Sequence, residues 1–270
     1  MSIVRSRKEQ QEASTKSQAL AGKVVIVSGA SSGIGAVTAQ ELARRGAQVV
    51  LAARRVSELE AQVSAITAAG HLAVAIPTDV TDAAQVTRLV EQTLDMFGRV
   101  DVLVNNAGIA WSKPFEKLSM EQIAQIANVN LLGTLLLTRA VLPGMLERRR
   151  GSIISVASVA GHMPVDPLYS ATKFGLRGFS LSLRRELAGR GISVSVVSPG
   201  FVRTAMSRNF RIPMPGPEIV ARTIADLILK PRREVIIPGY YHAIIGIEHL
   251  FPWLGDLAVR SARPRIETKK

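Results

Sequence analysis

The chain has 270 residues, of which 47% are hydrophobic and 4% aromatic, a balance that suits an α/β protein with helices on both faces of a sheet. It contains no cysteine, which excludes disulfides, thiolate metal sites and a cysteine nucleophile. The formal net charge of +13 is dispersed along the chain without interleaved aromatic residues, which argues against a nucleic-acid partner.

The first 20 residues are polar and lack the apolar core and cleavage-like site of a secretory signal. We therefore expect residues 1–20 to form a disordered arm and the protein to be cytoplasmic.

From residue 23 the pattern is regular, and KVVIVS predicts a strand that is buried on both faces. The turn Gly29–Gly35, GASSGIG, then leads into a helix that closes near Gly46. Glycines between a buried strand and a helix N-terminus let the backbone approach a phosphate, which the free N–H groups attract. The spacing is G-x-x-x-G-x-G and not the usual G-x-G-x-x-G, so the turn alone also fits a tight turn without a ligand.

The second predicted strand, Gln48–Arg55, bears on the choice of cofactor. In a dinucleotide-binding unit, a carboxylate that ends this strand binds the ribose 2′-hydroxyl of NAD. Here Ala53 stands at that position, and Arg54 and Arg55 follow with guanidinium groups that suit a 2′-phosphate. We favour NADP(H) over NAD(H), the alternative being that both arginines are solvated.

Polar residues end the next two predicted strands. Asp79 lies at the end of HLAVAIPTDV, where it could bind an adenine amino group or cap the following helix. The segment Val100–Gly108, VDVLVNNAG, predicts a fourth strand and a turn in which Asn105 and Asn106 bridge neighbouring loops.

The segment that carries candidate chemistry follows a long predicted helix, Met120–Leu146. That helix contains Asn130, a poor helix former that either faces solvent or forms local hydrogen bonds. A fifth strand, SIISVAS, ends at Ser158, beside a helix on which Tyr169 and Lys173 share one face. An ammonium group beside a phenol lowers the tyrosine pKa and makes Tyr169 a better proton donor or acceptor near neutral pH. An isolated pair of this kind is more often a surface pair.

The remaining pattern completes one domain over residues 21–238. It predicts a sixth strand, Ile192–Gly200, a helix, Ile219–Leu229, and a last strand, Glu234–Pro238. The Pro-rich segment Arg208–Glu218 is expected to be irregular, as a mobile lid would be. Strands that alternate with helices predict a Rossmann-type, doubly wound parallel sheet of about seven strands, and no histidine spacing suits a metal site.

The last segment, residues 239–270, is an apolar and basic extension. Its apolar run, Tyr240–Val259, is interrupted by charged residues, histidines and Pro252, and is too broken for a confident membrane span. It could cover the substrate pocket, pack on a partner subunit, or lie on a membrane with its basic end at the lipid headgroups. Packing in a core or an interface is the simpler expectation.

The chain resembles the classical short-chain dehydrogenase/reductase family over roughly residues 23–238. An ordered set of motifs carries this resemblance: SGASSGIG, Asp79-Val80, NNAG, the N-x-x-G at Asn130, Ser158, Tyr169-x-x-x-Lys173 and Pro199-Gly200-x-x-x-Thr204. It implies a single-domain fold, a homodimer or homotetramer formed through the long helices, and nicotinamide-dependent exchange between an alcohol and a carbonyl.

The resemblance also implies roles for individual residues. Tyr169 is the expected general acid for a carbonyl oxygen, Lys173 tunes it and binds the nicotinamide ribose, and Ser158 orients the substrate oxygen. Asn130 is expected to hold a water that relays protons between Lys173 and solvent. The expected cofactor-binding residues are Gly29, Ser31, Ser32, Gly33, Ile34 and Gly35 at the pyrophosphate, Arg54 and Arg55 at the 2′-phosphate, Asp79 and Val80 at the adenine, Asn106, Ala107 and Gly108 on the adenosine side, Tyr169 and Lys173, and Pro199, Gly200, Val202 and Thr204 at the nicotinamide.

The chain departs from the family pattern near the substrate. The interval from Ser158 to Tyr169 is two residues shorter than the commonest spacing, which reshapes one wall of the site, and Ser155 is a fallback for the catalytic serine. Ala157 replaces a hydroxyl residue that is usual in the family.

These observations lead to an NADP(H)-dependent reductase of ketones or aldehydes that acts on an apolar small molecule. One alternative is an NAD-linked alcohol dehydrogenase of the same fold. Another is a cofactor sensor or scaffold without activity, against which the retained Tyr169, Lys173, Ser158 and Asn130 argue. A third is a peripheral membrane enzyme that uses residues 239–270.

Overall fold

The computed structural model describes residues 18–111, 113–207 and 213–262. Most of the predicted arm therefore lies outside the described residues. Its end belongs to the fold, because Leu20 is fully buried and its N–H donates to the carbonyl of Arg45 at 2.8 Å. Part of the predicted lid, residues 208–212, also lies outside the described residues, and residues 213–217 before the next helix are irregular.

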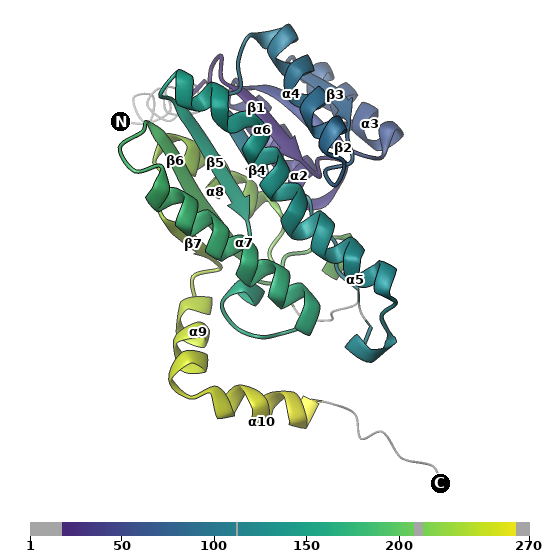
Figure 1. Cartoon of the computed structure of the whole chain (residues 1–270), viewed down its shortest axis with the longest axis vertical. Coiled ribbons are helices and arrows are strands. Elements are labelled where there is room, and N and C mark those ends of the chain that lie inside the picture. Colours follow the sequence, from purple (N-terminus) through teal and green to yellow (C-terminus); the bar gives the residue numbers. More distant parts are fainter. Residues whose placement is uncertain (1–17, 112, 208–212, 263–270) are drawn as a thin grey trace, which may run out of the picture.

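A single sheet of seven parallel strands forms the centre of the molecule, in the order β3-β2-β1-β4-β5-β6-β7 (Figure 1). The order in which successive strands are added to the sheet reverses between β1 and β4. Doubly wound sheets bind ligands at such a point, at the carboxyl ends of their strands. The fold class predicted from sequence is confirmed. The strands are β1 Val24–Ser28, β2 Gln48–Ala53, β3 Ala73–Pro77, β4 Val102–Asn105, β5 Gly151–Val156, β6 Ile192–Pro199 and β7 Glu234–Ile237.

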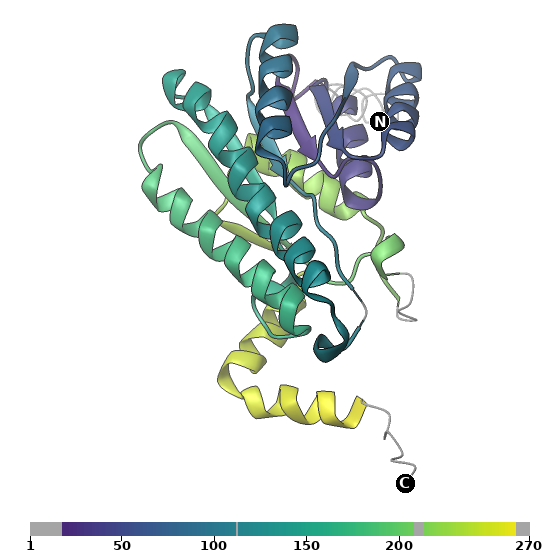
Figure 2. The same cartoon turned by 45° about the vertical axis from the view of Figure 1, so that its right-hand side comes forward.

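Helices cover both faces of the sheet, as Figure 2 shows. One apolar core joins the sheet to α2 (Gly33–Arg44), α3 (Val56–Ala68) and α8 (Glu218–Leu229). A second core joins the other face to α4 (Ala83–Phe97), α6 (Gly133–Glu147) and α7 (Pro167–Glu186). Central strands such as β1 are buried at every position, which explains why they read as continuous aliphatic runs.

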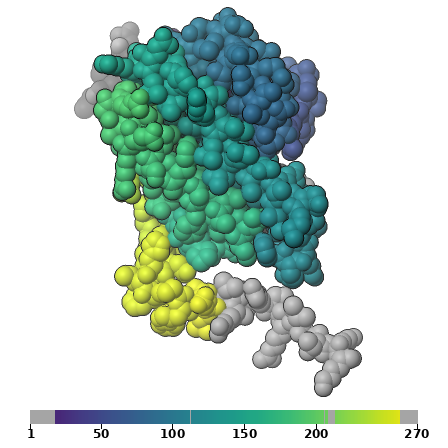
Figure 3. Space-filling model, viewed as in Figure 1, coloured from purple at the N-terminus to yellow at the C-terminus, as the bar shows by residue number. Residues whose placement is uncertain are grey.

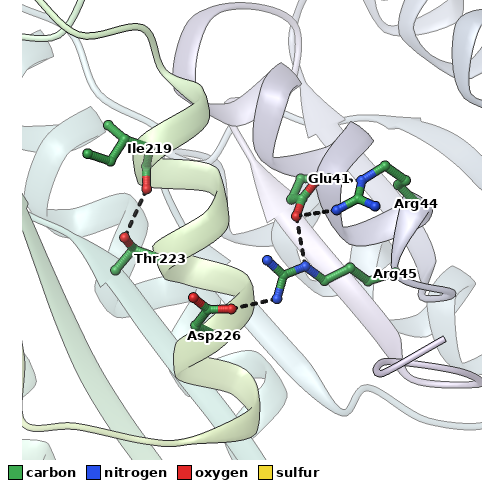
Figure 4. A network of polar contacts seen from close by, with 6 residues as sticks. All are labelled: Glu41, Arg44, Arg45, Ile219, Thr223 and Asp226. Carbon is green, nitrogen blue, oxygen red and sulfur yellow. Dashed lines mark hydrogen bonds and ion pairs between the residues drawn. The ribbon is translucent and has the colours of Figure 1, made fainter. Parts of the chain in front are cut away.

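On the first of these faces, a polar clamp holds α2 against α8 (Figure 4). Arg45, whose side chain is 8% exposed, donates to Glu41 at 2.7 Å and to Asp226 at 2.6 Å. Burial would raise the pKa of Glu41, but hydrogen bonds from Arg44 and Arg45 lower it below the ordinary value. Because α2 starts at the glycine turn, this clamp helps to fix the helix that points at the ligand site.

The long helix predicted before β5 consists of three pieces. α5 spans Met120–Ala127, a π-helical turn spans Asn128–Leu132, and α6 follows. By length and composition alone, Met120–Glu147 is the one span among the described residues that could cross a membrane. Its parts pack on α4 and α7, and 44% of its most apolar window is buried, as expected of a core helix.

Two helices follow the sheet in the predicted extension. α9 (Tyr241–Leu250) packs on β7, and α10 (Pro252–Ala262) packs on α9. The space-filling view shows these helices as a yellow lobe below the domain (Figure 3). Tyr241 and Ile245 of α9 are buried in a small apolar cluster with Val159 and Ile236.

Candidate active site

A pocket of about 880 Å³ opens where the carboxyl ends of the strands meet. It brings together the turns that follow β1 to β6, although these are separated by up to about 180 residues in the sequence. Of the predicted site residues, all but Gly35 and Asn130 line the pocket. These lining residues are Gly29, Ser31, Ser32, Gly33, Ile34, Arg54, Arg55, Asp79, Val80, Asn106, Ala107, Gly108, Ser158, Tyr169, Lys173, Pro199, Gly200, Val202 and Thr204.

The glycines after β1 are required by the backbone geometry. Gly29 has φ +65° and Gly33 has φ +57°, a region that side chains with a Cβ rarely adopt. Gly35 lies behind the pocket, where a Cβ would come within 2.3 Å of the Gly29 carbonyl oxygen and 2.5 Å of Asn106 Nδ2. Gly35 therefore lets α2 pack tightly against the turn and does not itself line the pocket.

The turn after β4 is bound to the turn after β1. Asn106 Nδ2 donates to the carbonyl oxygen of Ser28 at 2.9 Å, and the N–H groups of Asn106 and Ala107 donate to Ser28 Oγ. Asn106 therefore bridges two loops as predicted. Asn105 does not reach a neighbouring loop, because its side chain donates to Thr138 of α6 at 3.1 Å.

The N-terminus of α2 is free to receive an anion. Ser32 stands at the N-cap with extended backbone, yet its side chain makes no capping bond, and the first turn carries no acidic residue. Helix N-termini that lack a cap leave N–H donors and a positive dipole end unsatisfied. A pyrophosphate seated on Gly33 and Ile34 would satisfy them, so these residues fit the phosphates of a dinucleotide.

Both arginines after β2 border the same end of the pocket. Arg55 Nη2 donates to Ser31 Oγ at 2.9 Å and to Ser32 Oγ at 2.8 Å, and thus lies across the glycine turn. Arg54 lies 3.9 Å from a carboxylate oxygen of Asp79 and is more than half exposed. Two cations, and no acidic residue at the end of β2, meet where the ribose of an adenosine would lie.

Of the two alternatives for Asp79, the structure excludes the capping of the following helix. Asp79 Oδ1 accepts hydrogen bonds from the N–H and hydroxyl of Thr81, at 2.9 and 2.7 Å. The N-cap of α4 is Asp82, which accepts from the N–H groups of Ala84 and Gln85. Asp79 therefore shapes the turn after β3, with its side chain 29% exposed at the pocket.

Tyr169, Lys173 and Ser158 converge at the other end of the pocket. Tyr169 stands in the first turn of α7, whose N-cap Asp166 accepts the Tyr169 N–H at 2.8 Å. Ser158 follows β5 and forms a hydrogen bond with Tyr169 through its side chain. Lys173 Nζ lies 5.6 Å from the centre of the Tyr169 ring and donates to the carbonyl of Val156 at 3.0 Å.

The acid–base balance of this trio differs from the expectation drawn from sequence. Burial raises the pKa of Tyr169, and the hydrogen bond with Ser158 lowers it only in part. Burial also lowers the pKa of Lys173 to about 8. The ammonium is not bonded to the phenol, so desolvation outweighs its influence on Tyr169.

Asn130 lies behind the pocket, in the π-helical turn. It is fully buried, accepts from the N–H of Ile109 at 2.8 Å, and donates to the Ile109 carbonyl and to Thr172 Oγ1. The local hydrogen-bonding alternative is therefore correct, and solvent exposure is wrong. π-helical turns widen a helix and are frequent at functional sites. A Cβ on Gly108 would lie 3.5 Å from Asn130 Oδ1 and 3.6 Å from Lys173 Nζ, so Gly108 lies close to both side chains.

Ser155 is not a substitute for Ser158. It is fully buried within β5 and accepts a hydrogen bond from Ser180 Oγ of α7 at 2.8 Å. Its hydroxyl thus faces the helix and not the pocket.

The turn after β6 is fixed by the C-terminal extension. A Cβ on Gly200 would overlap the ring of Tyr241, and Tyr241 Oη accepts the N–H of Phe201 at 3.4 Å. Thr204 lies next to Gly33, because a Cβ on Gly33 would meet its methyl group at 3.6 Å. The contact with Tyr241 was not predicted, since a tyrosine at the start of an apolar helix carries no distinctive signal.

Two further features escaped the sequence analysis. The first is a set of apolar side chains that line the pocket, which we call the apolar wall; it comprises Trp111, Met163, Val165, Phe201 and Met206. The second is a buried polar cluster beside the short loop between Ser158 and Tyr169.

In that cluster, His162 Nε2 lies 2.9 Å from Glu234 Oε1 and 3.1 Å from Ser198 Oγ. Arg177 donates to both carboxylate oxygens of Glu234. Burial would raise the pKa of Glu234, but the bonds from His162 and Arg177 hold it at about 2. The cluster ties the short loop to β6, β7 and α7. Among the described residues, no group of three or more His, Cys, Asp or Glu side chains could hold a metal ion.

Comparison with known proteins agrees with this geometry. The short chain dehydrogenase family matches residues 23–214. The ketoacyl reductase HetN of Nostoc sp. is 41% identical over 227 residues, which cover 81% of this chain and 79% of that protein. A 3-oxoacyl-[acyl-carrier-protein] reductase of Synechocystis sp. is also 41% identical and covers 81% of this chain and 94% of its own length.

A solved structure extends the likeness to the fold. The actinorhodin polyketide ketoreductase, determined with NADPH, superposes with a TM-score of 0.76 at 31% identity and covers 81% of this chain and 96% of its own. The chain therefore belongs to the classical short-chain dehydrogenase/reductase family and is an NAD(P)-dependent oxidoreductase acting on alcohol and carbonyl groups.

Proposed function

We propose that the protein reduces an apolar ketone or aldehyde with NADPH, and that Ser158, Tyr169 and Lys173 carry the proton chemistry. The observation that carries this proposal is the convergence of Ser158, Tyr169 and the buried Lys173 in the same pocket as the uncapped glycine turn. The bound nicotinamide supplies a hydride to the carbonyl carbon.

The protein supplies the proton and the electrostatics. Charge develops on the carbonyl oxygen as the carbon is reduced, and two aligned hydroxyl donors stabilise it. Ser158 orients that oxygen, and Tyr169 donates its proton to it. Because burial raises the pKa of Tyr169, the phenol is protonated at neutral pH and holds the proton that the carbonyl oxygen receives.

The proton must then be replaced on Tyr169. Lys173 has a pKa of about 8, so it can release and regain a proton near neutral pH. Gly108 lies close to both Lys173 and Asn130, and a water held beside it would connect the ammonium to solvent. We propose this water-linked relay as the function of Asn130.

Arg54 and Arg55 support NADPH over NADH. A 2′-phosphate placed near the end of β2 would meet two guanidinium groups and no acidic residue at the strand end. Arg55 already crosses the glycine turn, so it needs little movement to meet such a phosphate.

The apolar wall supports an apolar substrate. The same pocket that contains Tyr169 is also lined by the apolar side chains Trp111, Met163, Val165, Phe201 and Met206. Since the relatives are named ketoacyl and 3-oxoacyl-carrier reductases, 3-oxoacyl thioesters come first in a substrate panel.

Fluorescence titration of the purified protein with NADPH and NADH tests the cofactor part of this proposal. Turnover of bound NADPH with a panel of 3-oxoacyl thioesters, aliphatic ketones and aldehydes tests the substrate part. We expect tighter binding of NADPH and oxidation of it by the apolar members. Tighter binding of NADH would favour the NAD-linked dehydrogenase, and turnover confined to polar carbonyls would contradict the apolar substrate.

A further inference from the structure

α9 and α10 present apolar side chains on their outer surface. The exposed residues include Ile247, Leu250 and Trp253, which are 51%, 74% and 61% exposed. We name the surface formed by Tyr240, Ile244, Ile247, Leu250, Phe251, Trp253 and Leu254 the C-terminal apolar surface. Contiguous exposed apolar residues on a soluble domain mark a site of contact with another body.

Two polar side chains of α9 contact other parts of the described structure. His249 bonds through Nε2 to the carbonyl of His162 at 2.9 Å, and the Glu248 carboxylate lies over Gly255 of α10. Ile244, Ile247 and Leu250 of α9 are exposed although they are apolar, which departs from the polar outer face of most surface helices. This arrangement stabilises contact with an apolar medium.

The sequence that follows α10 is basic. Residues 263–270 contain four basic residues, Arg263, Arg265, Lys269 and Lys270, and one acidic residue, Glu267. Apolar helices that carry Trp and Tyr and adjoin basic residues are suited to the interface of an anionic bilayer.

We propose that the C-terminal apolar surface binds an anionic lipid bilayer. The anionic leaflet of a cell membrane is the cytoplasmic one, so this agrees with the cytoplasmic location expected from sequence. A second copy of the chain is the competing occupant. The charge disfavours it, since each copy carries a net charge of +13 and two copies repel each other.

The same end of the molecule holds the apolar wall of the pocket. Met163 lines the pocket and packs against the cluster that contains Tyr241 and Ile245 of α9. A bilayer on α9 and α10 would therefore lie near the substrate end of the pocket and far from β3, at the other side of the sheet (Figures 1 and 2). This placement suits a lipophilic carbonyl compound that enters from the membrane, a step that rests on the proposed function.

Co-sedimentation of the full chain with vesicles tests the proposal. The vesicles contain phosphatidylcholine alone or with a minority of phosphatidylglycerol, and the experiment is repeated at high salt. We expect binding to the anionic vesicles, weaker binding at high salt, and little binding to neutral ones. Intact protein that stays in the supernatant with anionic vesicles would overturn the proposal.

Two variants and their matched controls sharpen this test. Leu250→Ser with Trp253→Ser removes two apolar anchors, and we expect a loss of more than about 100-fold in vesicle affinity. Its control is Leu72→Ser with Met96→Ser, which removes two exposed apolar residues, one before β3 and one on α4, and should bind as the parent does. Arg263→Gln with Arg265→Gln should weaken binding about 30-fold, at roughly fivefold per charge. Its control, Arg232→Gln with Arg233→Gln, removes the same charge before β7 and should have a smaller effect.

Size-exclusion chromatography of the same variants separates the competing occupant. If Leu250→Ser with Trp253→Ser reduces the oligomer size and vesicle binding is absent, the surface is an interface between copies and the lipid proposal is wrong. Turnover of a water-soluble ketone without vesicles is measured in parallel. If the parent protein shows no such turnover, the proposed function is contradicted, while the result of the vesicle experiment still decides the lipid proposal.

Discussion

The two ends of the pocket are built in different ways. At the cofactor end the backbone itself is constrained: Gly29 and Gly35 leave no space for a Cβ, Gly33 has φ +57°, and Asn106 bonds to the adjoining turn. At the substrate end, exposed apolar side chains such as Met206, which is 50% exposed, face the cavity and leave its shape to their rotamers. The first end allows few sequences, whereas the second allows many.

The comparison teaches where specificity can change without loss of the reaction. Substitutions at the cofactor end disturb the packing of α2 against the sheet, and with it the anion site. Substitutions on the apolar wall change which molecule fits and leave Ser158, Tyr169 and Lys173 in place. The predictions below begin with the sites where the largest effects are expected.

Gly35→Ala should have the largest effect at the cofactor end. The added methyl group would lie 2.3 Å from the Gly29 carbonyl oxygen and force α2 away from the turn. We expect a loss of more than about 100-fold in NADPH affinity, measured by fluorescence titration, because the N–H donors would no longer converge.

Gly178→Ala is the control, since a Cβ there meets nothing within 4 Å. That variant should bind NADPH normally and be more stable by about 0.5–1 kcal/mol. Equal binding by both variants would contradict the account.

Lys173→Met should lower activity and raise stability together. We expect turnover to fall by about 10²-fold or more, because proton replacement on Tyr169 is lost. Lys173 is completely buried and its pKa falls from 10.5 to about 8, so holding its charge at pH 7 disfavours the folded state. Methionine has no charge to bury, and the free energy of unfolding should rise by up to about 3 kcal/mol at pH 7.

The pH dependence of this gain in the free energy of unfolding tests its cause. Between about pH 8 and 10.5 the unfolded chain holds the Lys173 proton more tightly than the folded chain, so the native protein gains stability as pH rises. The advantage of Lys173→Met in urea unfolding should therefore shrink from pH 7 towards pH 10. An advantage that stays constant over this range would show that desolvation of Lys173 is not its cause.

Ser158→Ala and Ser155→Ala separate the two serines of the β5 segment. Ser158→Ala removes a donor to the substrate oxygen, and we expect kcat to fall by about 10²–10³-fold. Ser155→Ala removes only the bond from Ser180, which should cost about 1 kcal/mol of stability with little change in kcat. The opposite pattern would assign the catalytic role to Ser155.

Arg54→Asp should shift the cofactor preference by about 10–100-fold towards NADH, measured as the ratio of the two dissociation constants. A charge-assisted bond to the 2′-phosphate is lost, and the new carboxylate can accept from a 2′-hydroxyl. Arg55→Asp should give a shift of the same sign. An unchanged ratio in both variants would remove the basis for the 2′-phosphate site.

Met206→Ser should have the smallest effect and should act on the substrate alone. We expect KM for apolar ketones to rise about 3- to 10-fold with NADPH affinity unchanged, since one half-exposed apolar contact is lost. A comparable change in NADPH affinity would show that the two ends of the pocket are not independent.

The sequence predicted the sheet and the cofactor end well, for a physical reason. Central strands buried on both faces are aliphatic at every position, and β1 and β6 were placed within one or two residues. The turns at the cofactor end need glycine and asparagine for steric reasons, so the residue types themselves reveal the geometry. Helical spacing places Tyr169 and Lys173 on one face, and the ordered set of family motifs identified them as candidate site residues.

The substrate end could not be predicted to the same depth. The π-helical turn at Asn130 and the cluster of His162, Arg177 and Glu234 depend on contacts between segments far apart in the sequence. The raised pKa of Tyr169 follows from burial, which only the assembled pocket determines. The sequence left three alternatives for the C-terminal segment. Covering the pocket is not supported by the structure, because no described residue of α9 or α10 lines the pocket.

The most direct test of the central claim compares the parent protein with Tyr169→Phe, measuring NADPH affinity and NADPH oxidation by an apolar ketone in the same preparations. Removal of a single hydroxyl leaves the ring and the packing of α7 in place. We predict that Tyr169→Phe binds NADPH with an affinity within about twofold of the parent and loses about 10²–10⁴-fold in turnover. Turnover by Tyr169→Phe close to that of the parent would contradict the claim that this phenol donates the proton.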